Sequence, residues 1–128
     1  MMEFLFNPKE SIILCHAEII GSKMDLFVKM AVDTGATYTM IPLEAAVAVG
    51  CDPLSSRRKI EITTGSGIEY VPILTIPKLK VFGITVERLD VVCHNLPAQS
   101  PVEGLLGLNF LHKAGLIIDF SRCVIRSA

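Results

Sequence analysis

The feature that most constrains the fold is an apolar stretch that ends abruptly at a carboxylate. Residues 26–32 are apolar apart from Lys29, and this pattern predicts a buried strand. Asp33, Thr34 and Gly35 follow directly, and Gly35 allows a turn that a side chain would obstruct. A carboxylate at the end of a buried strand is unfavourable unless a partner hydrogen-bonds it or chemistry uses it. Asp33 is therefore the first candidate functional residue, although an Asp-Thr-Gly tripeptide also occurs in ordinary turns.

Length and composition predict one small domain. The chain has 128 residues, of which 51% are hydrophobic, so we expect a core together with a subunit interface. No apolar run approaches the ~20 residues of a membrane span, and the N-terminal residues do not resemble a signal peptide. The net charge is −1 and no basic block is present. We therefore expect no nucleic-acid partner and no membrane partner.

The cysteines and histidines give no pattern typical of a metal site. Neither a C-x-x-C spacing nor a metal-like histidine spacing occurs. Each of the four cysteines lies in or beside an apolar run, where a free thiol behaves as a small hydrophobe. We expect reduced thiols in a cytoplasmic protein, with no metal and no cofactor, while the sequence itself leaves a disulfide open.

The remaining chain predicts mainly short strands. Residues 1–10 predict a loosely held lead-in, and residues 11–20 predict a strand that pairs with residues 26–32 through a turn at Gly21 and Ser22. A first short helix is expected from Pro42 to Gly50, and a second is expected to end near Gly115. Further strands are expected at residues 60–64, 68–71, 72–81, 84–92, 116–120 and 123–125, and residues 38–41 form a short apolar stretch. Pro72 and Pro77 indicate that their strands are edges or carry bulges, and the basic residues 57–59 predict a solvated edge.

A glycine-tipped hairpin is expected in the middle of the chain. The alternating residues 60–64 are followed by Gly65, Ser66 and Gly67, after which the chain returns along residues 68–71. Two glycines at the tip allow it to flex. Taken alone, the hairpin is equally typical of an ordinary exposed turn.

Two motifs together resemble those of the retropepsin-like (retroviral-type) aspartic peptidase family. Asp33-Thr34-Gly35-Ala36 resembles the active-site loop of that family. Leu105-Leu106-Gly107 resembles the apolar-apolar-Gly element that crosses behind this loop, and Gly107 follows Asp33 by 74 residues. The resemblance covers about residues 11–126 and places the glycine-tipped hairpin between the two motifs. It implies that Thr64, Gly65, Ser66 and Gly67 form the tip of a flap that closes over substrate.

The resemblance implies a mainly β fold. We expect a closed acid-protease-type β-barrel with one or two short helices, one lobe per chain, over residues 11–128. It also implies hydrolysis of a polypeptide by two carboxylates that flank one water, one as general base and one as general acid. The other aspartates are followed by Leu, Pro, Val or Phe, so none of them begins a second Asp-Thr-Gly. The expected enzyme is therefore a C2 homodimer that brings Asp33 of each subunit together.

Roles within the loop follow from the resemblance. Asp33 is the acid or base, the Thr34 hydroxyl bonds the backbone of the partner's loop, and Gly35 lets its amide approach the carboxylate. Ala36 offers no hydroxyl to the carboxylate, so the shared proton should be held to higher pH. We therefore expect activity that extends toward neutral pH.

The chain also departs from the family pattern. Viral members pair their two termini in the dimer sheet, whereas here residues 116–125 predict a self-contained hairpin and the lead-in contains Pro8. Tyr38 adds bulk near the loop. Two other hypotheses stay open: a catalytically weak dimerisation or binding module with the same fold, and an unrelated β-barrel in which Asp33 is only a turn residue.

Overall fold

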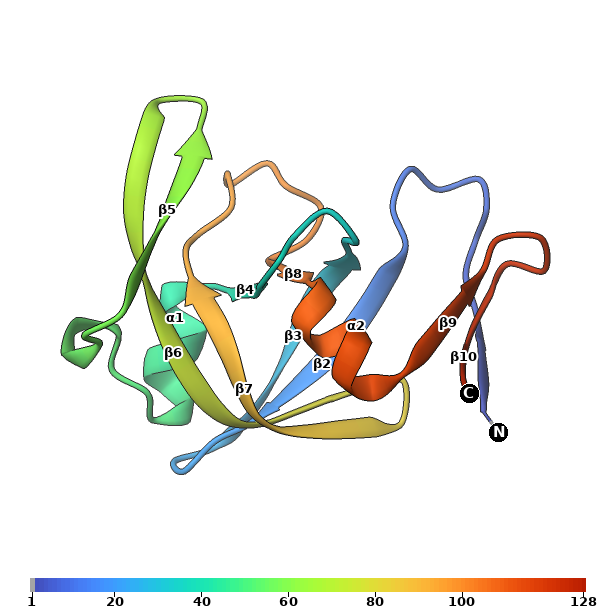
Figure 1. Cartoon of the computed structure of the whole chain (residues 1–128), viewed down its shortest axis with the longest axis horizontal. Coiled ribbons are helices and arrows are strands. Elements are labelled where there is room, and N and C mark those ends of the chain that lie inside the picture. The colour runs from blue at the N-terminus through green and yellow to red at the C-terminus, as the bar shows by residue number, and fades with distance from the viewer. Residues whose placement is uncertain (1) are drawn as a thin grey trace.

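The computed structural model describes residues 2–128 and consists mainly of β-strands (Figure 1). The strands are β1 (Glu3–Leu5), β2 (Leu14–Ile20), β3 (Asp25–Val32), β4 (Thr39–Ile41), β5 (Lys59–Thr64), β6 (Gly67–Val81), β7 (Ile84–Cys93), β8 (Gly104–Leu106), β9 (Leu116–Asp119) and β10 (Val124–Ser127). The helices are α1 (Leu43–Val49), α2 (Leu108–Ala114) and a 3₁₀ turn at Pro53–Ser55.

Six strands close into a barrel in the order β2-β3-β8-β4-β7-β6. Closure occurs where β6 pairs with β2, with Leu79 opposite Ile19. β3 and β8 are parallel, as are β4 and β7, and the other neighbours are antiparallel. A closed barrel leaves no free sheet edge around its circumference. The expected mainly β fold with a closed barrel is confirmed, and it has two short helices where one or two were expected.

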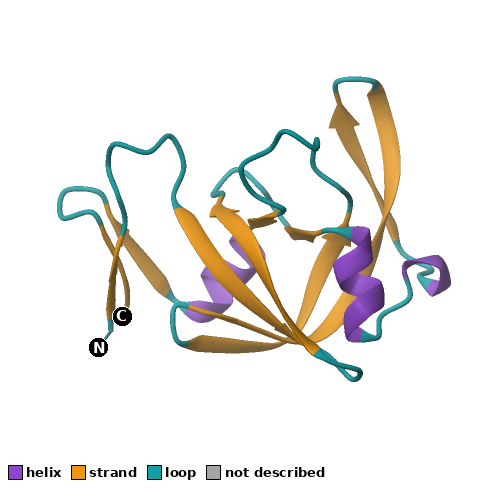
Figure 2. Cartoon of the chain, turned by 180° about the vertical axis from the view of Figure 1, so that it is seen from behind, coloured by secondary structure: helices purple, strands orange, loops and turns teal. Residues whose placement is uncertain are grey.

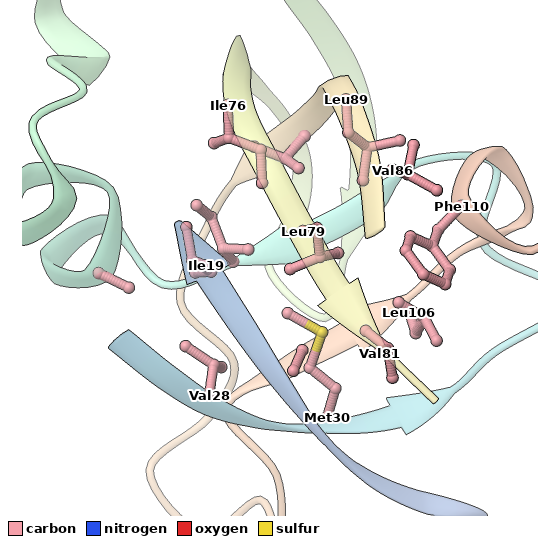
Figure 3. Close-up of a cluster of buried hydrophobic side chains, with 14 of the residues drawn as sticks. Ile19, Val28, Met30, Ile76, Leu79, Val81, Val86, Leu89, Leu106 and Phe110 are labelled. Carbon is pink, nitrogen blue, oxygen red and sulfur yellow. The ribbon is translucent and has the colours of Figure 1, made fainter. Parts of the chain in front are cut away.

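Alternating apolar side chains from the strands fill the barrel interior, as Figure 3 shows. The fully buried residues include Ile19, Val28, Met30, Leu89 and Phe110. Each such side chain contributes roughly 1.5–3 kcal/mol relative to an exposed position. Because a strand exposes alternate side chains to opposite faces, a shift of one residue would turn the buried side chains of the strands outward, and the core therefore fixes the strand register.

Both helices end where a glycine follows them. Gly50 has a φ of 103° and Gly115 a φ of 63°, a left-handed conformation that terminates a helix at little strain in glycine. The expected helix ends are therefore confirmed. α2 is nearer the viewer in Figure 1 and α1 in Figure 2, so the two helices cover different faces of the barrel.

The N-terminal residues are more ordered than the sequence predicts. β1 pairs with β10, and β10 pairs with β9, so the two chain ends form one three-stranded antiparallel sheet. Phe4 packs on Phe82, with ring centroids 5.4 Å apart, and Phe6 packs edge-on against Phe120. The expected loosely held lead-in and self-contained C-terminal hairpin are thus both wrong in this respect. A partner strand more than a hundred residues away stabilises the N-terminal segment.

Several expected boundaries also shift. β2 begins at Leu14, and four residues, 21–24, connect it to β3 in place of the expected two-residue turn. β6 is one continuous strand where two were expected. At Pro72 it pairs with the outer strand β5, and its pairing with β7 begins only at Ile73. The pairing of β6 with β7 skips Pro77 and Arg88, and Arg88 has a φ of 52°. The irregularity expected at Pro77 is therefore present, although β6 is a central strand.

Candidate active site

The loop between β3 and β4 holds Asp33 at the end of a buried strand. The Asp33 amide donates to the Leu106 carbonyl at 2.9 Å, and the Ala36 amide donates to the Asp33 carbonyl at 3.2 Å. The carboxylate Oδ1 of Asp33 accepts a hydrogen bond from the Gly35 amide at 2.9 Å. A Cβ atom at position 35 would lie 3.2 Å from that same oxygen, so the glycine keeps the approach open. The turn itself therefore orients the carboxylate.

Asp33 and Thr34 face the surface of the protomer. The Asp33 side chain is partly buried, whereas Thr34 and Gly35 are exposed. A second molecule can therefore reach both the carboxylate and the threonine hydroxyl.

The second predicted motif lies directly behind this loop. β8 runs parallel to β3, with Leu105 opposite Ala31, and antiparallel to β4, with Leu105 opposite Met40. It therefore separates the two strands that flank the Asp33 loop. A Cβ atom on Gly107 would lie 2.5 Å from the Tyr38 carbonyl carbon and 2.6 Å from its oxygen, so only glycine fits there. The structure thus brings Leu105, Leu106 and Gly107 together with Asp33.

Two buried polar residues that the sequence did not single out brace the loop. Thr39 is fully buried, and its hydroxyl donates to Oδ1 of Asn109 at 2.9 Å while accepting the Gly107 amide at 3.1 Å. Oδ1 of Asn109 also accepts the Thr39 amide at 2.9 Å. The available signal was a single polar residue within each of two otherwise apolar runs, residues 38–41 and 108–111.

The start of α2 holds the other side of the loop. The Leu108 amide donates to the Ala36 carbonyl at 2.8 Å, and the Asn109 amide donates to the Thr37 carbonyl at 3.2 Å. Main-chain hydrogen bonds therefore fix the loop at its start through β8 and at its end through α2. This rigidity is what a site needs when its geometry must be exact before substrate arrives.

β5 and β6 form the predicted hairpin, which projects beyond the barrel (Figure 1). At the tip, the Ser66 amide donates to Oγ1 of Thr64, whose hydroxyl donates to the Gly67 carbonyl, both at 3.2 Å. Gly67 has a φ of 119°, and a Cβ atom at Gly65 or Gly67 would meet no atom within 4 Å. The tip stands apart from the loop between β3 and β4 in Figures 1 and 2. The structure therefore does not place Thr64–Gly67 beside Asp33 of the same chain.

Two cavities border the loop between β3 and β4. One, of about 260 Å³, lies between the loop and β5 and is lined mostly by apolar side chains. The other, of about 600 Å³, reaches Asp33 and is bounded by residues 6–13 and by the loop that precedes β8. The first is lined by Ala36, Thr37, Tyr38, Met40, Ile60, Glu61, Ile62 and Val92. The larger cavity is lined by Asp33 itself, whereas the smaller one borders the end of its loop, so both lie where a bound peptide could extend from the carboxylate.

Metal-ligating groups do not gather near this loop. Over residues 2–128, no cluster of three or more His, Cys, Asp or Glu side chains is arranged to hold a metal ion. All four cysteines are free, and two of them, Cys15 and Cys93, are buried. Within the same described part of the chain, no helix is long and apolar enough to cross a bilayer.

Comparison with known proteins gives a consistent result. The sequence model of the family described as gag-polyprotein putative aspartyl protease matches residues 21–113. The structure is similar to the crystal structure of a retropepsin-like aspartic protease from Rickettsia conorii, with a TM-score of 0.71. This similarity covers 97% of this chain and 87% of that one at 19% sequence identity, so it speaks for the fold alone. No curated protein matches the sequence significantly.

Proposed function

Because the chain belongs to the gag-polyprotein putative aspartyl protease family, we propose that it is an aspartic endopeptidase whose active site two copies of the chain complete. One observation carries the proposal. A partly exposed carboxylate, Asp33, ends a buried strand in a loop that β8 and α2 brace from behind.

The proposed chemistry uses two Asp33 carboxyl groups, one from each subunit. One Asp33 carboxylate draws a proton from a water molecule as the water attacks the peptide carbonyl. The protonated Asp33 of the second subunit donates to the carbonyl oxygen. Two carboxyl groups about 3 Å apart cannot both ionise easily, and aspartic proteases are the standard example of such a pair sharing one proton.

Two of the other aspartates have carboxylates that are already engaged elsewhere, which supports the need for a second copy. Hydrogen bonds from Arg58 and Thr75 occupy the Asp90 carboxylate. Hydrogen bonds from Ser121 and Arg126 similarly occupy that of Asp119, in the terminal sheet. Neither lies on a loop like that of Asp33. A C2 axis close to Asp33 would supply the missing carboxylate by symmetry.

The proposed substrate is an extended polypeptide with apolar side chains next to the scissile bond. The cavity at Asp33 and the cavity at the end of its loop are both mainly apolar, and the flap of each subunit would close over the bound chain. In this proposal Thr34 holds the partner's loop, and Thr64, Gly65, Ser66 and Gly67 cover the substrate. We also propose a cytoplasmic location and activity toward neutral pH, since the cysteines are free and Ala36 gives the carboxylate no hydroxyl.

Digestion of a peptide library, with the Asp33→Asn variant as the matched control, tests this function. Wild type should cut at apolar sites, and the variant should cut none of them. Sedimentation of both proteins at micromolar concentration should show the same dimer, because an amide replaces the carboxylate with almost no change of shape. Equal cleavage by both proteins would exclude Asp33 as the catalytic group. A dimer in which neither protein cuts would favour a dimerisation or binding module, and a folded monomer would count against the paired site.

A further inference from the structure

A hydrogen-bonded network begins where the flap leaves the barrel. Arg58 immediately precedes β5, and its guanidinium binds both carboxylate oxygens of Asp90 on β7, each at 3.0 Å. The Thr75 hydroxyl of β6 donates to Oδ1 of Asp90 at 2.7 Å and accepts from Arg58 at 3.2 Å. A two-pronged contact of this kind fixes the direction of a guanidinium as well as its distance.

The main chain of Arg58 is held at the same point. Its carbonyl accepts the Ile73 amide at 2.9 Å and the Ser56 hydroxyl at 3.0 Å. β6 changes partner here, because residues 67–72 pair with β5 whereas β7 is the partner from Ile73 onward. Arg58 therefore lies at the position about which the flap would tilt relative to the barrel.

The other end of the network reaches the brace of the catalytic loop. The Asn109 side-chain amide donates to the Asp90 carbonyl at 2.6 Å. Oδ1 of Asn109 accepts from Thr39, and the Thr39 hydroxyl accepts the Gly107 amide. A continuous series of hydrogen bonds thus joins the flap base to the residues directly behind Asp33.

The charges of this pair are complementary over a wide pH range. The hydrogen bond from Arg58, followed by that from Thr75, holds the pKa of Asp90 below its ordinary value. The chain also offers a contrasting pair on β6 and β7. There Lys78 approaches Glu87 through a single contact at 3.9 Å.

We propose that the Arg58–Asp90 ion pair is a positioning device that sets the flap relative to the catalytic loop. The inference rests on the proposed peptidase function, because a flap position matters only where a substrate is covered. Arg58 lines neither cavity and its side chain hydrogen-bonds to Asp90 and Thr75, so it acts through the hairpin. Loss of the pair releases the flap but leaves the turn that orients Asp33 intact.

The kinetic test compares Arg58→Met, Asp90→Asn and the control Lys78→Met on one peptide substrate. The first two should raise KM about fivefold and change kcat by less than about twofold. The fivefold change in KM corresponds to the interaction energy that well-formed exposed ion pairs reach. Lys78→Met should change neither constant. The double variant should resemble either single variant, because each removes the same contact. Equal changes in kcat and KM, or additive effects, would overturn the proposal.

Hydrogen exchange gives a second readout that needs no activity. In Arg58→Met, the amides of β5 and of residues 67–72 should exchange about fivefold faster than in wild type, whereas those of β2 and β3 should not change. If wild type cleaves nothing but the flap amides respond in this way, the peptidase function fails and the positioning role stands. Unchanged flap exchange together with unchanged KM would refute the positioning role whatever the activity.

Discussion

The buried hydroxyl of Thr39 provides the sharpest test of how the Asp33 loop is braced. Thr39→Val keeps the shape of the side chain and removes only its hydroxyl. That hydroxyl makes two hydrogen bonds, one to Asn109 and one from the Gly107 amide. The substitution should therefore destabilise the protein without opening a cavity.

The expected size of the effect follows from the two bonds. Loss of the contact with Asn109 removes about 1 kcal/mol, and Oδ1 of Asn109 keeps its bonds from the main chain. The buried Gly107 amide is left without a partner, which adds about 1–3 kcal/mol. The free energy of unfolding should therefore fall by about 2–4 kcal/mol, a large part of the stability of a single domain.

Urea denaturation measures this difference. At fixed protein concentration, the midpoint should drop by about 1–2 M, while the slope stays that of wild type. Thr85→Val is the matched control, because Thr85 is exposed on β7 and should change stability by less than about 0.5 kcal/mol. If the two variants are equally stable, the hydroxyl does not brace the loop and the reasoning is refuted.

Two further predictions concern close packing and buried thiols. Gly107→Ala should destabilise by about 3 kcal/mol or more, because its Cβ would overlap main-chain atoms, whereas Gly65→Ala should stay within about 0.5 kcal/mol of wild type in the same urea assay. Burial raises the pKa of the Cys15 and Cys93 thiols to about 12, from an ordinary 9.0. The unfolded chain therefore ionises first, so this contribution to stability is complete below pH 9 and declines as the pH rises toward 12. Thermal melts across that range should show the decline, and a double Cys→Ala variant that declines equally would contradict its assignment to the thiols.

Local patterns in the sequence predict much of the barrel and of the loop. Alternating apolar residues determine which face of each strand is buried, and Gly50 and Gly115 mark helix ends through a conformation that other residues adopt at a cost. The turn around Asp33 follows for the same reason, because its main hydrogen bond joins residues only two apart. Contacts of this kind join residues only a few positions apart, so a short stretch of sequence is enough to predict them.

The features that the sequence missed depend on residues far apart in the chain. The sequence predicts that Arg58 is a solvated cation, because its partner Asp90 lies 32 residues later in the chain. Thr39 and Asn109 are separated by 70 residues, so neither reveals its partner. β1 is too short to predict from its own residues and depends on β10 at the other end of the chain. In each case tertiary contact, and not local propensity, determines the outcome.

The terminal sheet limits how two copies can meet. β10 already has β1 on one side and β9 on the other, so a partner's strand cannot insert next to β10 without displacing one of them. The outer edges of β1 and β9 are the places left for addition, and Leu5 and Phe120 nearby are 84% and 69% exposed. A C2 axis must also pass near Asp33 if the two carboxylates are to share a water molecule. We therefore expect a dimer that contacts this sheet from outside, in which each chain keeps its own ends paired and contributes one Asp33 to the shared site.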